Sequence, residues 1–260
     1  MRCRLLLPAV FSLLWSPTLF AAPIARPVEW TIGGDTFAGV LVYDDAVKQP
    51  RPGLVMVPNW MGVTKDSIER AKAVAGDDYV VLVADVYGKG IRPKTDAEAG
   101  PVATAMRADR PKLRARVQKA VEVLKQQPGT LVDVTRIGAF GYCFGGSTVL
   151  ELVRAGDALS GVVSLHGGLA TDLPAAGPVK SPVLVLNGGD DTYVSAAEIT
   201  AFQDEMRKAG ADWQFVSFGG AVHCFAESDA QNPPGCVYHA PSARRAYRMM
   251  ADFFEDVFAK

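Results

Sequence analysis

The stretch Arg136–Gly146, with the sequence RIGAFGYCFGG, is the part of this chain that most strongly indicates its fold. Its first five residues favour a β-strand, and a helix-like stretch follows from Ser147 to Arg154. Between them, Cys143 has one glycine two residues before it and another two residues after it, a spacing typical of a nucleophile elbow with cysteine in place of serine. Glycine is needed there because the strand and helix backbones come so close that a Cβ would clash.

The thiol of Cys143 is the expected nucleophile of this elbow. The N-terminus of the following helix favours the negatively charged thiolate, which is the reactive form of cysteine. The alternative is a small buried cysteine on a glycine-rich turn, since free cysteine is among the most buried residue types. The strand, the spacing and the helix together favour the nucleophile.

Length and composition indicate a globular chain. The 260 residues have a hydrophobic content of 49% and a formal net charge of −1. This length suits one large α/β domain with a well-buried core. The near-neutral charge and the lack of a Lys/Arg block argue against nucleic acid or an anionic membrane surface as a partner.

The first 22 residues have the pattern of a secretory signal peptide. Two arginines among the first four residues precede an apolar region, Leu5–Trp15, and small residues stand at Ala21 and Ala22. This order predicts cleavage near Ala21 or Ala22, one mature domain over residues 23–260, and a periplasmic or secreted protein without a membrane span. The alternative is an uncleaved membrane anchor.

Export would leave three cysteines in the mature chain, Cys143, Cys224 and Cys236. An odd number in an oxidising compartment indicates one bridge and one free thiol. Cys224 and Cys236 enclose a short polar loop, so we expect a disulfide between them and a free Cys143. In the chain-entropy model a loop of this size contributes about 3 kcal/mol. The alternative is that both thiols are unpaired, because a sequence does not show the geometry of a bridge.

Apolar runs separated by helical segments predict a mainly parallel, doubly wound α/β sheet with helices on both faces. The expected strands are a hairpin over residues 28–43, then Leu54–Val57, Val80–Ala84, Ile137–Phe140, Val162–Leu165, Val183–Leu186 and Asp212–Phe218. The expected helices include Ser67–Ala75, Arg110–Gln126, Ala196–Ala209 and Ala243–Phe258, and Lys89–Gly100 is expected to be a surface excursion. Active sites in such sheets lie beyond the carboxyl ends of the strands.

A cysteine nucleophile needs a base, and the base needs an orienting partner. His223 follows the expected last strand, where the elbow architecture places its histidine, so it is the predicted base. His166 follows an earlier strand and is expected to be structural, and His239 is expected in a solvated loop.

The orienting acid is expected after the strand Val183–Leu186, where Asp190 and Asp191 are both candidates. Asp191 is favoured because Val194, three residues further on, can anchor the loop. The other aspartate is then expected to face solvent or to cap the helix near Ser195.

An oxyanion hole requires two backbone N–H groups directed at one point. One is expected from Phe144 and the other from Asn59–Met61, with Trp60 favoured. Four side chains are expected to bind the substrate in an apolar cleft, namely Asn59, Tyr87, Tyr142 and Phe225.

These motifs resemble those of the dienelactone hydrolase family, a branch of the α/β-hydrolase fold with a Cys-Asp-His triad. The resemblance runs from about Val28 onward and includes the elbow Gly141–Gly146, the acid loop Gly188–Val194, His223, Ala84–Gly88 and the last helix with Phe253 and Phe254. It implies Cys143 as nucleophile, Asp191 as orienting acid and His223 as base. It also implies hydrolysis of an ester or lactone with no metal and no cofactor.

Two positions depart from the family pattern. Where the founding enzymes have a glutamate that helps to ionise the thiol, this chain has Asn59. Where they have an arginine that binds the substrate carboxylate, four residues after the histidine, this chain has Glu227, which would repel it. These departures predict a substrate other than the family's namesake, and Arg107 and Arg110 are candidates for a replacement cation.

The sequence therefore predicts an exported hydrolase of a small ester or lactone. One alternative is a thioesterase, acyltransferase or peptidase that uses the same triad. Another is an exported binding protein that kept the fold without catalysis, because fold alone does not imply function. A redox protein is disfavoured, since no second cysteine lies close to Cys143 in the sequence. The sequence does not indicate the acyl group, the alcohol or the oligomeric state.

Overall fold

The computed structural model describes residues 23–260, so the predicted signal peptide lies outside the described residues. The strands are β1 (Ile24–Ile32), β2 (Asp35–Tyr43), β3 (Arg51–Val57), β4 (Val80–Val83), β5 (Val132–Tyr142), β6 (Gly161–Leu165), β7 (Val183–Gly188), β8 (Trp213–Phe218), β9 (Gln231–Asn232) and β10 (Cys236–Val237). The helices are α1 (Lys65–Ala75), α2 (Asp96–Ala108), α3 (Arg110–Lys125), α4 (Phe144–Ala155), α5 (Ala196–Lys208) and α6 (Ala240–Phe258).

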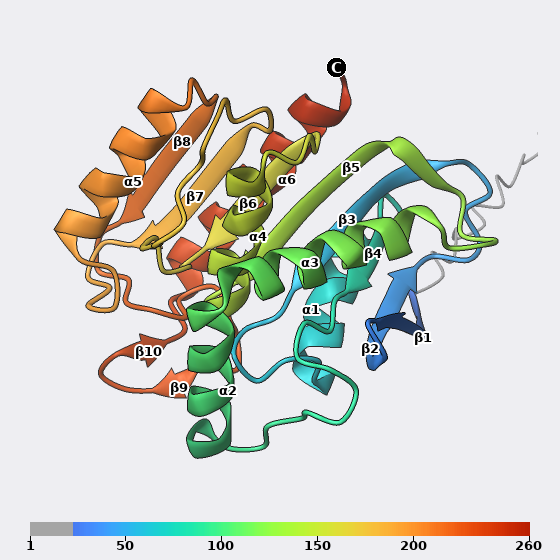
Figure 1. Cartoon of the computed structure of the whole chain (residues 1–260), viewed down its shortest axis with the longest axis horizontal. Helices are drawn as coiled ribbons and strands as arrows, with labels where there is room; N and C mark the ends of the chain where they lie inside the picture. The colour runs from blue at the N-terminus through green and yellow to red at the C-terminus, as the bar shows by residue number, and fades with distance from the viewer. Residues whose placement is uncertain (1–22) are drawn as a thin grey trace, which may run out of the picture.

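The main sheet has eight strands in the order β1-β2-β4-β3-β5-β6-β7-β8 (Figure 1). The β1–β2 and β2–β4 pairs are antiparallel, and every pair from β4 to β8 is parallel. The strand order changes direction at β3. From β3 the chain continues to β4, on the side of β2, and then crosses to β5 on the other side of β3. This arrangement confirms the predicted mainly parallel, doubly wound sheet of the α/β-hydrolase fold.

Helices cover both faces of the sheet, which explains why the central strands are apolar throughout. All residues of β3, β4, β6 and β7 are buried. One core, on the face of α2, α3, α4 and α5, includes Leu113 and Phe202, while the core on the opposite face, under α1 and α6, includes Ala71 and Phe254. In Figure 1 α3 and α4 lie in front of the sheet and α6 lies behind it. Strands buried on both faces cannot alternate polar and apolar residues.

The prediction that Lys89–Gly100 is a surface excursion is wrong at its end, because α2 begins at Asp96. The side chain of Thr95 caps this helix by accepting a hydrogen bond from the N–H of Glu98. Pro101 lies within the helix, and a proline after a glycine normally marks a break. That signal obscured the helix in the sequence.

The carboxyl ends of the parallel strands lie along one edge of the sheet, and the predicted site residues follow them. Cys143 follows β5, His166 follows β6, Asp191 lies just beyond β7 and His223 lies beyond β8. Among residues 23–260, no helix combines the length and the apolar character needed to cross a membrane.

Candidate active site

Cys143 occupies a strained turn between β5 and α4. Its φ of 52° and ψ of −115° lie in a region that non-glycine residues rarely adopt. A Cβ on Gly145 would lie 1.9 Å from the carbonyl oxygen of Val57, and a Cβ on Gly141 would lie 2.3 Å from the carbonyl of Gly145. Both glycines are therefore required by close backbone approach, as the spacing predicted.

The backbone of Cys143 is held by the neighbouring strand end. Its N–H donates to the carbonyl oxygen of Leu165 at 3.0 Å and to Nδ1 of His166 at 3.2 Å. The side chain is half-buried, and it is the only free cysteine in residues 23–260. The thiol thus stands at the start of α4, where the helix N-terminus favours negative charge.

His223 and Asp191 form a buried hydrogen-bonded pair beside this turn. The distance between His223 Nδ1 and Asp191 Oδ2 is 2.8 Å, and the second carboxylate oxygen accepts the N–H of Tyr193. Asp190, in contrast, is exposed, and the structure places it away from the histidine. Of the two candidate acids, Asp191 is the one in contact with His223.

The environment of His223 favours its protonated form. Burial lowers the pKa of His223, but hydrogen bonds to Asp191 and Cys143 outweigh it and raise the pKa to about 10. The interaction with Cys143 places the imidazole next to the thiol, so the histidine can take its proton. The carboxylate of Asp191 stabilises the imidazolium that results.

The two predicted oxyanion donors lie on either side of the elbow. Phe144 is the first residue of α4, and its N–H has no acceptor among the residues that the structure describes. In the loop after β3, the N–H of Met61 already donates to Asn59 Oδ1, while the carbonyl of Trp60 accepts from the hydroxyl of Tyr87 at 3.0 Å. The first bond occupies the N–H of Met61, which leaves Trp60 as the better donor of the two, and the second bond fixes the loop.

A small cavity of about 80 Å³ opens above the thiol. It is lined by Asn59, Trp60, Cys143, Cys224, Glu227, Asp229, Ala230 and Cys236. Of the four predicted substrate-binding side chains, only Asn59 lines this cavity. Tyr142 and Phe225 are fully buried in the core, and Tyr87 packs against Phe144 at a ring-centroid distance of 5.3 Å, so the structure corrects these three to supporting positions.

Asn59 and Glu227, the two departures from the family pattern, contact each other. Asn59 Nδ2 donates to Glu227 Oε2, and Arg70 Nη2 lies 3.0 Å from the same oxygen. Burial raises the pKa of Glu227, whereas Arg70 and Asn59 lower it. Sequence reasoning did not find Arg70, because it lies on α1 as one basic residue in an ordinary amphipathic helix.

The two candidate cations have different surroundings. Arg110 is buried and binds Glu151 and the carbonyl of Ala170, so it is a structural residue. The guanidinium of Arg107 lies 5.3 Å from the ring centroid of Phe144, which places it beside the elbow.

The predicted disulfide is present between Cys224 and Cys236, next to the histidine. Val237 N donates to the carbonyl oxygen of His223 at 3.1 Å, so the backbone on both sides of the bridge is joined. The short strands β9 and β10 pair within this loop and were not predicted. The bridge therefore forms part of the cavity wall and holds the histidine loop.

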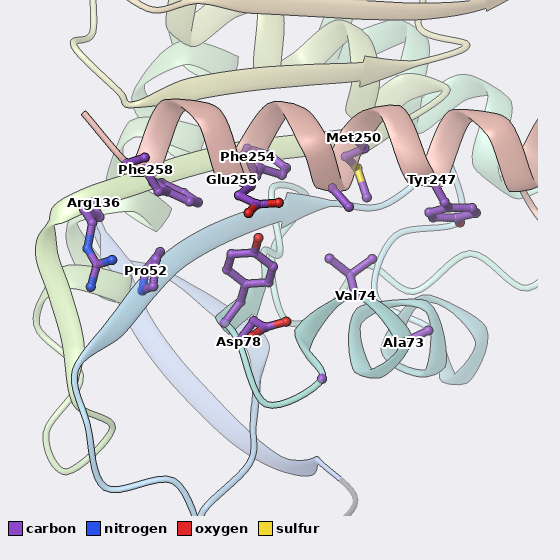
Figure 2. Close-up of a pocket in the computed structure, with 14 residues that line it drawn as sticks. Pro52, Ala73, Val74, Asp78, Arg136, Tyr247, Met250, Phe254, Glu255 and Phe258 are labelled. Atoms are coloured by element: carbon purple, nitrogen blue, oxygen red, sulfur yellow. The ribbon is translucent and has the colours of Figure 1, made fainter.

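A larger groove, of about 840 Å³, lies between α1 and α6 on the other face of the sheet (Figure 2). Figure 2 shows Met250, Phe254 and Phe258 of α6 on one side of it and Val74 of α1 on the other. No histidine or cysteine is among its described lining residues. The groove therefore lacks the groups needed for nucleophilic hydrolysis.

Comparisons with known proteins agree with this geometry. The family model "Dienelactone hydrolase family" matches residues 37–258. Carboxymethylenebutenolidase of Pseudomonas putida is 28% identical over 234 residues, which are 87% of this chain and 94% of that protein. An uncharacterised protein of Caenorhabditis elegans is 33% identical over 153 residues, 57% of this chain and 96% of that one.

A solved structure is similar over nearly the same length. It is a dienelactone hydrolase-like promiscuous phosphotriesterase from metagenomic libraries, with 35% identity and a TM-score of 0.86. The match covers 92% of this chain and 100% of that chain. With the family model spanning most of its length, this protein belongs to the dienelactone hydrolase family and is a hydrolase.

Proposed function

We propose that this protein is an exported hydrolase that cleaves a small carboxylic ester or lactone through the triad Cys143, His223 and Asp191. The observation that carries the proposal is the 2.8 Å hydrogen bond between His223 and Asp191 beside the half-buried thiol of Cys143. A nucleophile, a base and an orienting carboxylate in this relation are what acyl transfer requires.

The reaction begins with the thiol proton of Cys143 already held by His223, and the thiolate sulfur attacks the carbonyl carbon. The electron pair of the carbonyl moves to its oxygen, which accepts hydrogen bonds from the N–H groups of Phe144 and Trp60. Collapse of this intermediate breaks the C–O bond, and the leaving alkoxide takes the proton from His223. Water then loses a proton to His223 and attacks the thioester carbonyl carbon. Collapse of this second intermediate breaks the C–S bond, so the acid is released and Cys143 leaves as a thiolate beside protonated His223.

The cavity favours a small acyl group without a carboxylate. Its volume is about 80 Å³, and Glu227 and Asp229 contribute carboxylates to its wall. Arg70 pairs with both carboxylates and offsets one of the two charges, so an anionic acyl group would still meet net negative charge there. Arg107, beside Phe144, is the nearer of the two cation candidates and can offset part of that charge.

The test is turnover of p-nitrophenyl acetate by the wild type and by Cys143→Ala. We expect the variant to lose turnover and the wild type to form an acetyl adduct on Cys143 that intact-mass analysis detects. Undiminished turnover by Cys143→Ala would remove the triad. A panel of short esters, lactones and thioesters, with competing nucleophiles, then separates hydrolysis from acyl transfer.

An aryl phosphotriester is a second candidate substrate class, because the promiscuous phosphotriesterase is 35% identical to this chain. In that reaction the same sulfur attacks phosphorus and displaces the aryloxide, and water then attacks phosphorus and breaks the P–S bond. The measurement is release of p-nitrophenol from diethyl p-nitrophenyl phosphate by the wild type and by Cys143→Ala. No release above the variant's rate eliminates this class.

Export is supported by the basic and apolar pattern of the first 22 residues and by the disulfide near His223. The test is expression of the full chain in a Gram-negative host, followed by fractionation and N-terminal sequencing. A periplasmic protein that begins near Ala21 or Ala22 is expected. A full-length protein in the cytoplasm would overturn the proposal.

A further inference from the structure

A line of buried polar groups runs behind the nucleophile, from Arg70 through Glu227 and His166 to the backbone of Cys143. Arg70 and Asn59 both donate to Oε2 of Glu227. At the other end, the N–H of Cys143 donates to Nδ1 of His166 at 3.2 Å. These contacts join residues from α1, the loop beyond β8, the end of β6 and the elbow.

The middle of this line contains two unpartnered buried atoms that face each other. Oε1 of Glu227 and Nε2 of His166 are 3.9 Å apart, and neither has a hydrogen-bond partner among residues 23–260. His166 is fully buried, and Glu227 is 2% exposed. Leaving a buried polar atom without a partner is unfavourable, so each atom is the natural counterpart of the other.

The direction of the hydrogen bonds determines which nitrogen of His166 carries the proton. Nδ1 accepts the N–H of Cys143 and is therefore unprotonated. Burial lowers the pKa of His166, as does the nearby His223, so the ring is neutral and its one proton is on Nε2. Nε2 lies 3.9 Å from a carboxylate oxygen of Glu227, beyond hydrogen-bond distance but close enough for attraction to its charge, and Arg70 and Asn59 occupy only the other oxygen.

We propose that Glu227 is a positioning residue for the nucleophile, and that it acts by holding His166 in the tautomer whose Nδ1 receives the N–H of Cys143. This inference rests on the proposed function, in which Cys143 is the nucleophile. It gives a role to a carboxylate that stands where the family pattern has an arginine, and to a histidine whose place in the chain excludes it as the base.

The strained backbone at both ends of this contact explains why the tautomer matters. Cys143 has a φ of 52° and His166 has a φ of 40°, and such conformations persist only where the surroundings enforce them. If the proton of His166 moved to Nδ1, two N–H groups would oppose each other, and the N–H of Cys143 would keep only the carbonyl oxygen of Leu165 as its acceptor. The sulfur would then shift relative to His223, whose ring centroid lies 5.1 Å from that of His166.

The direct test is ¹⁵N NMR of the histidine side chains in the wild type and in Glu227→Gln. We expect the wild type to carry the His166 proton on Nε2. In Glu227→Gln, Arg70 and Asn59 bind the amide oxygen, which leaves the NH₂ group facing His166. The proton should then move to Nδ1, and the amide proton of Cys143 should shift upfield because it loses one of its two acceptors and keeps the carbonyl oxygen of Leu165. A wild-type His166 protonated on Nδ1 overturns the proposal without any variant.

Asp229→Asn is the matched control. It removes the carboxylate of Asp229, which also pairs with Arg70 and lines the same cavity. In this line of contacts Asp229 connects to His166 only through Arg70 and Glu227. Its His166 proton should stay on Nε2. If Asp229→Asn and Glu227→Gln change the His166 signals alike, general loss of charge explains the effect and the proposal is overturned.

Kinetics with p-nitrophenyl acetate supply the second readout. For Glu227→Gln we expect kcat to fall by about tenfold or more while KM changes by less than about twofold, because a small misplacement of a reacting atom slows chemistry rather than binding. The positioning role is overturned if the His166 proton moves to Nδ1 and kcat is unchanged. It is also overturned if kcat falls while the proton stays on Nε2. If the wild type cleaves no ester, the proposed function fails, whereas the NMR measurements still decide the link from Glu227 to Cys143.

Discussion

The proposed nucleophile and the proposed base of this site are held in place in different ways. The elbow around Cys143 has a local sequence signature, since Gly141 allows β5 and α4 to approach within backbone contact and Gly145 allows α4 to approach the end of β3. The loop that carries His223 depends on distant residues, namely Asp191, 32 positions earlier, and the bridge to Cys236. The first can be recognised in a short motif, whereas the second requires the fold to be formed.

The largest effect is expected from breaking the elbow with Gly145→Ala. The new Cβ would lie 1.9 Å from the carbonyl oxygen of Val57, and neither backbone can move without displacing β3 or α4. We expect a loss of more than about 3 kcal/mol in the free energy of unfolding, at or beyond the usual cost of overpacking, and no esterase activity. Urea denaturation and p-nitrophenyl acetate turnover measure the two effects.

Gly177→Ala is the control for this substitution. A Cβ at Gly177 has no atom within 4 Å, so both stability and turnover should stay close to wild type. If Gly145→Ala behaved like Gly177→Ala, close approach at the elbow would not be what requires a glycine.

Breaking the long-range contact to the base is expected to have the next largest effect. In Asp191→Asn the amide can no longer stabilise the imidazolium of His223, and it disturbs the tautomer that the carboxylate favours. We expect kcat to fall about a thousandfold or more, with little change in fold by circular dichroism. Asp190→Asn, at the exposed neighbour, should keep kcat within about twofold, and equal losses in the two variants would argue against the assignment.

This difference between local and distant contacts also explains how far the sequence could be interpreted. The glycine spacing around Cys143, the apolar runs of β3 to β7 and the position of His223 after the last strand are local patterns, and each predicted an element that the structure contains. The sequence did not predict α2, because a proline normally breaks a helix and Pro101 lies within this one. In the folded protein the packing of α2 outweighs that local preference.

Side-chain directions were harder to predict than elements. Tyr142 was expected in the cleft because it precedes the nucleophile, but alternate residues of a strand point to opposite faces, and its ring enters the core under α6. The contact among Arg70, Asn59 and Glu227 joins positions up to 168 residues apart, and no local pattern indicates it.

Removing the disulfide tests the histidine loop with a smaller expected effect. The double variant Cys224→Ala/Cys236→Ala should lose about 3 kcal/mol in the free energy of unfolding, because the bridge restricts the unfolded chain. Its kcat should fall less than that of Asp191→Asn, since the 2.8 Å bond to Asp191 and the Val237 contact still hold His223.

A reductant distinguishes the bridge from the substitutions themselves. Dithiothreitol should lower the stability of the wild type toward that of the double variant and leave the double variant unchanged. A double variant as stable as the oxidised wild type would mean that the hydrogen bonds alone hold the loop.

The last prediction concerns pH and follows from the charge of His223. Its pKa is raised from an ordinary value of 6.5 to about 10 in the folded protein. A group with a raised folded pKa contributes stability that is fully present below the unfolded pKa and is lost as the pH rises through the folded pKa. The difference in unfolding free energy between wild type and His223→Gln should therefore be greatest below pH 6.5 and should shrink toward pH 10. Denaturant titrations at both pH values measure this difference, and a gap that widens with pH would mean that the neutral imidazole is the form that the fold stabilises.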